Sequence, residues 1–95
     1  MFLKDYYPKL SIKYSKIIFK GISFNSKRVK KNFIFFAIKG NSIDGNNFIK
    51  DAISRGSKII ISEKCEEGLR EDVLYLNNKN PRKLLADFSV KLNGE

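Results

Sequence analysis

The sequence predicts an α/β fold, a small mixed sheet with flanking helices, on three observations. Short apolar runs typical of buried strands alternate with segments whose apolar residues recur at helical spacing. The links between these segments are short and polar. The chain has 95 residues, of which 42% are hydrophobic, enough to bury a modest core and too apolar for a disordered segment. We therefore expect one layered domain over residues 1–95.

The N-terminal part of the chain is expected to contain a short helical turn and one or two strands. The segment FLKDYYPKL, residues 2–10, has apolar residues at helical spacing, and its turn should end at Pro8. Between Ile12 and Phe24, apolar residues occur in short runs that Gly21 interrupts. This pattern predicts two short strands or one bent strand, followed by a polar turn.

The centre of the chain predicts a buried strand and a helix. Residues 33–38, FIFFAI, are apolar on both faces, which is typical of an interior strand covered on two sides. After the polar segment GNSIDG, residues 40–45, either Asp44 or Asn46 can cap a helix. The expected apolar stripe of this helix consists of Phe48, Ile49, Ala52 and Ile53.

The central helix is expected to connect two parallel strands. It should end at Arg55 and Gly56, which supply a basic last turn and a residue suited to a left-handed stop. The segment SKIIIS, residues 57–62, predicts a second buried strand. Because connections between parallel strands of one sheet are right-handed, residues 33–62 predict one right-handed strand–helix–strand crossover.

The C-terminal third predicts a loop, a strand and a closing helix. The charged segment EKCEEGLRE, residues 63–71, is expected to be a loop, and VLYL, residues 73–76, a third strand. Asn80 followed by Pro81 is a suitable cap and first-turn pair. The helix should end near Gly94. Its apolar stripe consists of Leu84, Leu85, Phe88 and Leu92.

Composition argues against several classes of protein. The chain has no histidine and a single cysteine, Cys65, so an internal disulfide and a zinc-ligand set are not expected. The longest apolar runs are far shorter than the ~20 residues needed to cross a bilayer. Lys4 and Asp5 interrupt the N-terminal segment, unlike the apolar core of a signal peptide. We therefore expect a cytoplasmic protein with no membrane insertion.

A net charge of +9 raises the possibility of a nucleic-acid partner. Only KRVKK, residues 27–31, is dense in charge, and such runs are most often solvated turns. The chain is also rich in Lys, Asn, Ile and Phe, residues with A/T-rich codons, so genome composition can explain part of the lysine count. A basic nucleic-acid-binding module therefore stays an alternative, and it is the less favoured one.

The polar segment GNSIDG has the glycine spacing of a phosphate-binding P-loop and lies between a strand and a helix. A P-loop then needs a lysine and a serine or threonine, but Asn46 and Asn47 follow here. An aspartate before a glycine at a helix start, as at Asp44, is more often a cap than a general base. From its residues alone, the chain is expected to be a binding module for an anionic ligand, with no catalytic residue assigned.

Five segments of residues 24–62 follow one another in a recognisable order: FNSK, VKKNFIFFAIKG, GNSIDGNNFI, AISRGS and KIIIS. Their order and spacing resemble the N-terminal domain of the Mur ligases, most closely the MurE branch. In that family a turn with Asp-Ser-Arg precedes a strand, a G-x-x-x-D-G-x-x-F-I loop and a helix ending in A-I-x-x-G-A. Asn25 and Lys27 stand where the family has aspartate and arginine.

The resemblance implies a substrate site. In the family this domain binds the UDP part of UDP-N-acetylmuramoyl-L-alanyl-D-glutamate, through the turn after the first strand and the loop after the second. Carried over to this chain, the substrate-binding residues are Phe24, Ser26, Asn41, Ser42 and Ile43. We expect backbone groups of the loop to bind the uracil edge, and the basic surroundings, including Lys27 and Lys39, to favour an anion.

The resemblance also implies partners outside these residues. In the family a central domain and a C-terminal domain use ATP and Mg²⁺ to phosphorylate the D-glutamate carboxylate, which an amine then attacks. We therefore expect no cofactor in residues 1–95, no activity of this segment alone, and a gene that continues past Glu95 into a P-loop domain. An N-terminal domain of the MurF type, from the ligase that adds D-Ala-D-Ala, stays the nearest alternative.

Overall fold

A five-stranded sheet organises the structure, a computed structural model that describes residues 1–93. The strands are β1 (Gly21–Ser23), β2 (Phe33–Ala37), β3 (Ile59–Ser62), β4 (Gly68–Arg70) and β5 (Val73–Asn77). Their order in the sheet is β1-β2-β3-β5-β4. The first four in this order are parallel, whereas β4 runs antiparallel to β5. The predicted small mixed sheet is confirmed.

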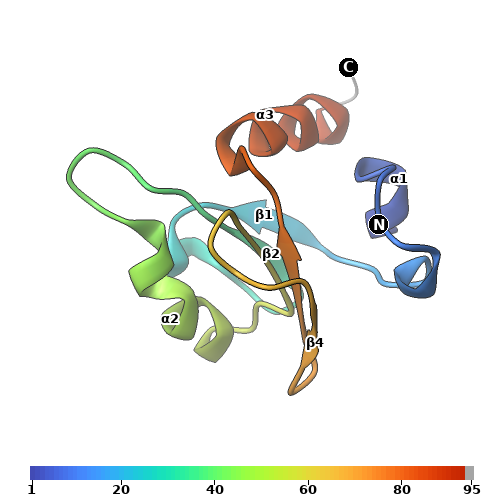
Figure 1. Cartoon of the computed structure of the whole chain (residues 1–95), viewed down its shortest axis with the longest axis horizontal. Coiled ribbons are helices and arrows are strands. Elements are labelled where there is room, and N and C mark those ends of the chain that lie inside the picture. The colour runs from blue at the N-terminus through green and yellow to red at the C-terminus, as the bar shows by residue number, and fades with distance from the viewer. Residues whose placement is uncertain (94–95) are drawn as a thin grey trace.

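Helices cover both faces of this sheet (Figure 1). They are α1 (Leu3–Tyr6), α2 (Ile49–Ser54) and α3 (Pro81–Leu92), with three short 3₁₀ turns at Ile12–Tyr14, Ser26–Arg28 and Gly45–Phe48. As predicted, α1 ends before Pro8, and Asn80 caps α3 by accepting a hydrogen bond from the Lys83 N–H at 3.1 Å. The expected end of α3 near Gly94 lies outside the described residues.

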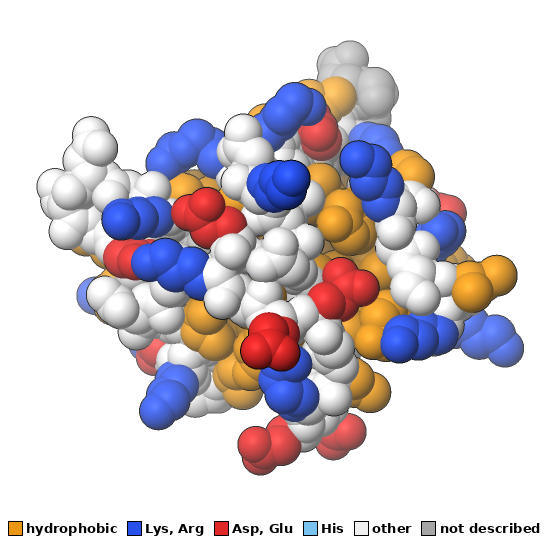
Figure 2. Space-filling model, in the orientation of Figure 1, with side chains coloured by type: hydrophobic (Ala, Val, Ile, Leu, Met, Phe, Trp, Pro, Cys, Tyr) orange, Lys and Arg blue, Asp and Glu red, His pale blue; other side chains and the backbone are white. Residues whose placement is uncertain are grey.

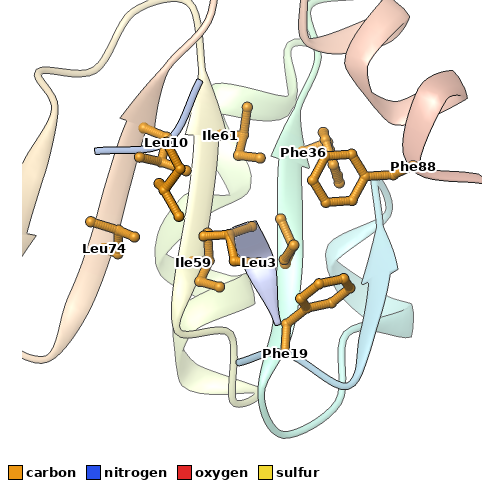
Figure 3. Close-up of a cluster of buried hydrophobic side chains, with 10 residues drawn as sticks. Leu3, Leu10, Phe19, Phe36, Ile59, Ile61, Leu74 and Phe88 are labelled. Carbon is orange, nitrogen blue, oxygen red and sulfur yellow. The ribbon is translucent and has the colours of Figure 1, made fainter. Parts of the chain in front are cut away.

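The larger core lies between the sheet and the pair α1 and α3 (Figure 3). Phe88 of α3 is fully buried there, with its ring centroid 5.4 Å from that of Phe36 and 5.9 Å from that of Phe19. Tyr6 completes this aromatic group at 5.6 Å from Phe88. Because the group joins α1, the segment before β1, β2 and α3, it fixes α3 over β2.

The smaller core lies on the opposite face, under α2. Phe35 and Ala37 of β2 point into it, while Ile34 and Phe36 point into the larger core. Successive residues of a strand face opposite sides of the sheet, so a strand covered on both sides must be apolar throughout. The prediction of an interior strand over residues 33–38 is confirmed, although the strand itself ends at Ala37.

The structure corrects two expectations. Residues 68–70, predicted as part of a charged loop, form the edge strand β4, which pairs with β5 and leaves Leu69 58% exposed. A short exposed edge strand needs no apolar pattern, so the charged residues of this segment did not indicate a strand. Between residues 12 and 24 there is one strand, β1, and Gly21 lies within it rather than interrupting it, because the Phe33 ring covers that position.

The segment between β2 and α2 folds back on itself as a narrow hairpin. The Gly40 N–H donates to the Ile43 carbonyl at 2.7 Å, and the Gly45 N–H donates to the Ile38 carbonyl at 2.8 Å. A side chain at position 45 would place its Cβ 2.7 Å from the Ile38 nitrogen, so only glycine allows this close approach. Residues 38–45, which we call the β2–α2 loop, project from the body of the molecule (Figure 1).

Asp44 anchors this loop to the rest of the domain. Its Oδ1 accepts hydrogen bonds from the Asn46 N–H at 2.9 Å and the Asn46 Nδ2 at 2.8 Å, while Lys64 Nζ donates to Oδ2 at 3.0 Å. Asn46 in turn accepts a hydrogen bond from Ser62, the buried last residue of β3. Asp44 therefore caps the 3₁₀ turn Gly45–Phe48, whereas α2, for which either Asp44 or Asn46 was the expected cap, begins at Ile49 with no side-chain cap.

We expect Phe88→Ala to lower the free energy of unfolding by about 3–5 kcal/mol, because it removes the ring that joins α3 to the sheet. Urea unfolding followed by circular dichroism measures this change. Val90→Ala is the matched control on the same helix, where the side chain is 51% exposed and a change below about 0.5 kcal/mol is expected. Equal effects of the two substitutions would contradict the assigned packing of α3.

Hydrogen bonds from Asn46 and the charge of Lys64 lower the pKa of Asp44 from 3.8 to about 2. Because the folded-state pKa lies below the unfolded value, the stabilisation from ionised Asp44 is complete above about pH 4 and is lost as the pH falls toward 2. The difference in unfolding free energy between the wild type and Asp44→Asn should therefore shrink over this range. An NMR titration of the Asp44 carboxyl carbon with a midpoint at or above 3.8 would contradict the network.

Candidate functional site

A pocket of about 600 Å³ opens at the edge of the sheet where the parallel strands end. Its walls come from the turn after β1, from the β2–α2 loop with Phe48, and from the start of α3. The lining residues are Phe24, Asn25, Ser26, Lys27, Ile38, Gly40, Asn41, Ser42, Ile43, Gly45, Phe48 and Arg82. In α/β proteins this edge is where ligands most often bind, because loops from neighbouring strands meet there.

All five site residues predicted from the sequence line this one pocket: Phe24, Ser26, Asn41, Ser42 and Ile43. They come from two loops that β2 separates in sequence and that the parallel pairing of β1 with β2 brings side by side. Phe24 is 63% exposed and Ile43 is 64% exposed, although both are large and apolar. Two such side chains at a pocket mouth form an apolar surface that a flat ligand could cover.

The tip of the β2–α2 loop presents backbone groups rather than side-chain contacts. The N–H groups of Asn41, Ser42 and Ile43 donate to no protein acceptor within residues 1–93. The three residues are exposed, while the loop base is fixed at Gly45 and Asp44. Three consecutive free donors on a fixed loop can bind carbonyl or phosphate oxygens.

The turn after β1 is held by its own polar side chains. The Ser23 hydroxyl accepts a hydrogen bond from the Asn25 N–H at 3.0 Å, and Asn25 Oδ1 accepts one from the Lys27 N–H at 3.0 Å. Asparagine at position 25 therefore still caps this turn, although it replaces the aspartate of the family pattern. The cap sets the direction in which residues 24–27 enter the pocket.

Ser26 lies between the pocket and helix α2. The residue is only 5% exposed, and its hydroxyl, together with the Arg55 guanidinium at 3.0 Å, holds the pKa of the Asp51 carboxyl below its ordinary value. The turn that contains Ser26 also packs against α2. Ser26 therefore has a structural environment beside its position in the pocket wall.

Two residues that line the pocket, Phe48 and Arg82, were not predicted from the sequence. Phe48 was expected in the buried stripe of the central helix, but it precedes α2, is 41% exposed and lines the pocket. Arg82 lies in the first turn of α3, which follows the parallel strand β5. The rule that the carboxyl ends of parallel strands share one edge would have located it, had the position of β5 in the sheet been known.

Two of the lining residues are charged, Lys27 and Arg82, and both are basic. Lys39, expected from the sequence to contribute, is exposed and does not line the pocket. Elsewhere the charge is mixed: Figure 2 shows Lys and Arg side chains spread over one face with Asp and Glu side chains between them. The pocket is therefore locally positive, which favours an anionic ligand.

The described part of the chain offers no alternative metal or membrane chemistry. Residues 1–93 contain no cluster of three potential metal-ligating side chains, and none of their helices is long and apolar enough to span a bilayer. Burial raises the pKa of the Cys65 thiol, which lies beyond β3 and does not line the pocket. The pocket walls offer backbone donors, hydroxyl groups, apolar surface and two cations, a set suited to binding.

Comparisons with known proteins agree with the fold and the motif order. Residues 18–91 match the family model described as "Mur ligase family, catalytic domain". Two similar proteins are both named UDP-N-acetylmuramoyl-L-alanyl-D-glutamate–2,6-diaminopimelate ligase. The one from Clostridium tetani is 42% identical over 73 residues, and the one from Aquifex aeolicus is 45% identical over 96 residues. These alignments cover 75% and 90% of this chain but 15% and 20% of the relatives.

A solved structure, the MurF ligase from Thermotoga maritima in complex with ADP, superposes with a TM-score of 0.62 at 28% identity. The superposition covers 79% of this chain and 17% of that one. The resemblance to the MurE branch is confirmed by the two diaminopimelate ligases, and the α/β fold is confirmed by the MurF structure. Since the family model spans most of the sequence, the chain belongs to the Mur ligase family.

Proposed function

We propose that this chain is the part of a peptidoglycan-precursor ligase that binds the UDP end of UDP-N-acetylmuramoyl-L-alanyl-D-glutamate. The observation that supports the proposal is the convergence of Phe24, Ser26 and residues 41–43 on one pocket. These are the positions that the family resemblance assigns to substrate binding. The two loops are neighbours because β1 pairs with β2, and all five residues that the family motif assigns to the substrate line the same pocket.

The chemistry of the pocket suits a uridine nucleotide. Uracil presents two carbonyl acceptors and one N–H donor along its edge, so free N–H groups at the tip of the β2–α2 loop match its carbonyl oxygens. Phe24, Ile43 and Phe48 supply apolar surface for the faces of the base and the ribose. The basic side chains of the pocket favour the diphosphate.

The ligation step is assigned to other parts of the full-length protein. In a Mur ligase, ATP and Mg²⁺ activate the D-glutamate carboxylate as an acyl phosphate, which the incoming amine attacks. In this chain Asn46 and Asn47 stand where a P-loop has a lysine and a hydroxyl residue. Asn46 is also hydrogen-bonded to Asp44 and Ser62. We therefore propose that this pocket binds the substrate and does not catalyse, although the family model is described as a catalytic domain.

Further features of the whole protein follow from the same proposal. Both relatives are named for the addition of 2,6-diaminopimelate, which favours this amino acid over lysine. They also favour the MurE branch over the MurF branch, although a MurF structure shares the fold. A precursor ligase of this kind acts in the cytoplasm, with central and C-terminal domains as partners of this one.

We expect Phe24→Ala to weaken the binding of UDP-N-acetylmuramoyl-L-alanyl-D-glutamate about fivefold to tenfold, because it removes apolar surface that the ligand covers. An NMR titration of the isotope-labelled chain measures the dissociation constant and locates the perturbed residues. Leu69→Ala is the matched control, since Leu69 is similarly exposed but lies on β4 outside the pocket. Shifts confined to residues 27–31, equalled by random DNA and abolished by moderate salt, would support the nucleic-acid alternative instead.

The 95-residue chain should show no ATP hydrolysis above the buffer background, with or without the substrate. The physical reason is that Asn46 and Asn47 cannot supply the cation and the magnesium-binding hydroxyl of a P-loop. A coupled assay for released phosphate tests this. ATP hydrolysis that co-purifies with the chain and is lost in Asp44→Ala would contradict the proposal that ATP chemistry belongs to the other domains.

A further inference from the structure

We infer that Arg82 binds the phosphate end of the ligand and makes the pocket select a nucleoside diphosphate over the bare nucleoside. This inference rests on the proposed function and extends it, because Arg82 lies outside the two loops from which the site was identified. It follows from the position of α3, from the free charge of Arg82 and from the chemistry of the guanidinium group.

The position of Arg82 is fixed by the helix that contains it. Pro81, the preceding residue, is buried, and the Asn80 cap holds the first turn. Phe88, further along the same helix, is locked into the aromatic core. The backbone of Arg82 is thus positioned by the cap and by buried residues on either side of it, and its side chain lines the pocket. A ligand that fills the pocket therefore meets Arg82 as well as the two loops.

Arg82 also has a free charge. Its guanidinium donates no hydrogen bond and forms no ion pair with any described residue. None of the residues that line the pocket is acidic, and the adjacent Asp44 is already paired with Lys64 at 3.0 Å. The side chain of Arg82 is exposed and lines the pocket, so its unpaired charge is available to an anion that binds there.

The second cation of the pocket, Lys27, likewise forms no ion pair with a described residue, so the two side chains differ in their chemistry. Lysine is a point charge on a flexible stem, whereas the planar guanidinium of arginine donates two parallel hydrogen bonds to phosphate oxygens. Arg82 is therefore expected to contribute more than Lys27 to the binding of phosphate.

The test compares uridine with UDP, each titrated by NMR into the wild-type chain and its variants at fixed moderate salt. Arg82→Gln should weaken UDP binding about tenfold, the effect of losing a charge-assisted bidentate contact, and leave uridine binding unchanged. Arg82→Lys should give an intermediate loss. Lys79→Gln is the matched control, because it removes the same charge from an exposed nearby residue that does not line the pocket.

The outcomes separate this inference from the proposed function. If the wild type binds uridine and UDP but Arg82→Gln weakens neither, or weakens both equally, the role of Arg82 is wrong while the uridine pocket stands. If Lys79→Gln weakens UDP as much as Arg82→Gln, the effect is one of net charge and the inference is also wrong. If the wild type binds neither ligand, the uridine pocket fails and the role of Arg82 fails with it.

Discussion

The parallel pairing of β1 with β2 is the interaction on which the rest of the structure depends. Its register places Ser23 opposite Phe35, so the turn after β1 emerges beside the last residues of β2 and the loop that follows them. β2 is held in this position from both sides, by the aromatic core under α3 and by the smaller core under α2. A shift of one residue in this register would exchange the two apolar faces and separate the two loops.

Much of the fold could be predicted from the sequence, as could five of the residues that line the candidate pocket, and the reason differs between elements. β2 and β3 are buried on both faces, so their continuous apolar runs identify them without tertiary information. The start of α3 follows from Asn80 and Pro81, whose effects are local. The five pocket residues were found because motif order preserves loop positions even where individual residues differ.

The features that were missed depend on contacts distant in sequence. β4 is stabilised by its pairing with β5 and by Arg70, which stacks on Tyr75 at 4.1 Å, so its own residues give no strand pattern. Phe48 matches a helical stripe in spacing, but a 3₁₀ turn precedes α2 and rotates its side chain toward the pocket. Arg82 reaches the pocket because β5 pairs with β3 in the sheet, and no pattern in the local sequence predicts that pairing.

The hairpin form of the β2–α2 loop affects which changes the family could tolerate at its tip. A ligand read by main-chain N–H groups is indifferent to the side chains that carry those groups, so positions 41 and 42 are free to drift among residues that keep the turn. Proline would delete a donor, and an insertion or deletion would move all three donors at once. Selection should therefore preserve the length of this loop and its bounding glycines, Gly40 and Gly45, more strictly than the identities of residues 41 and 42.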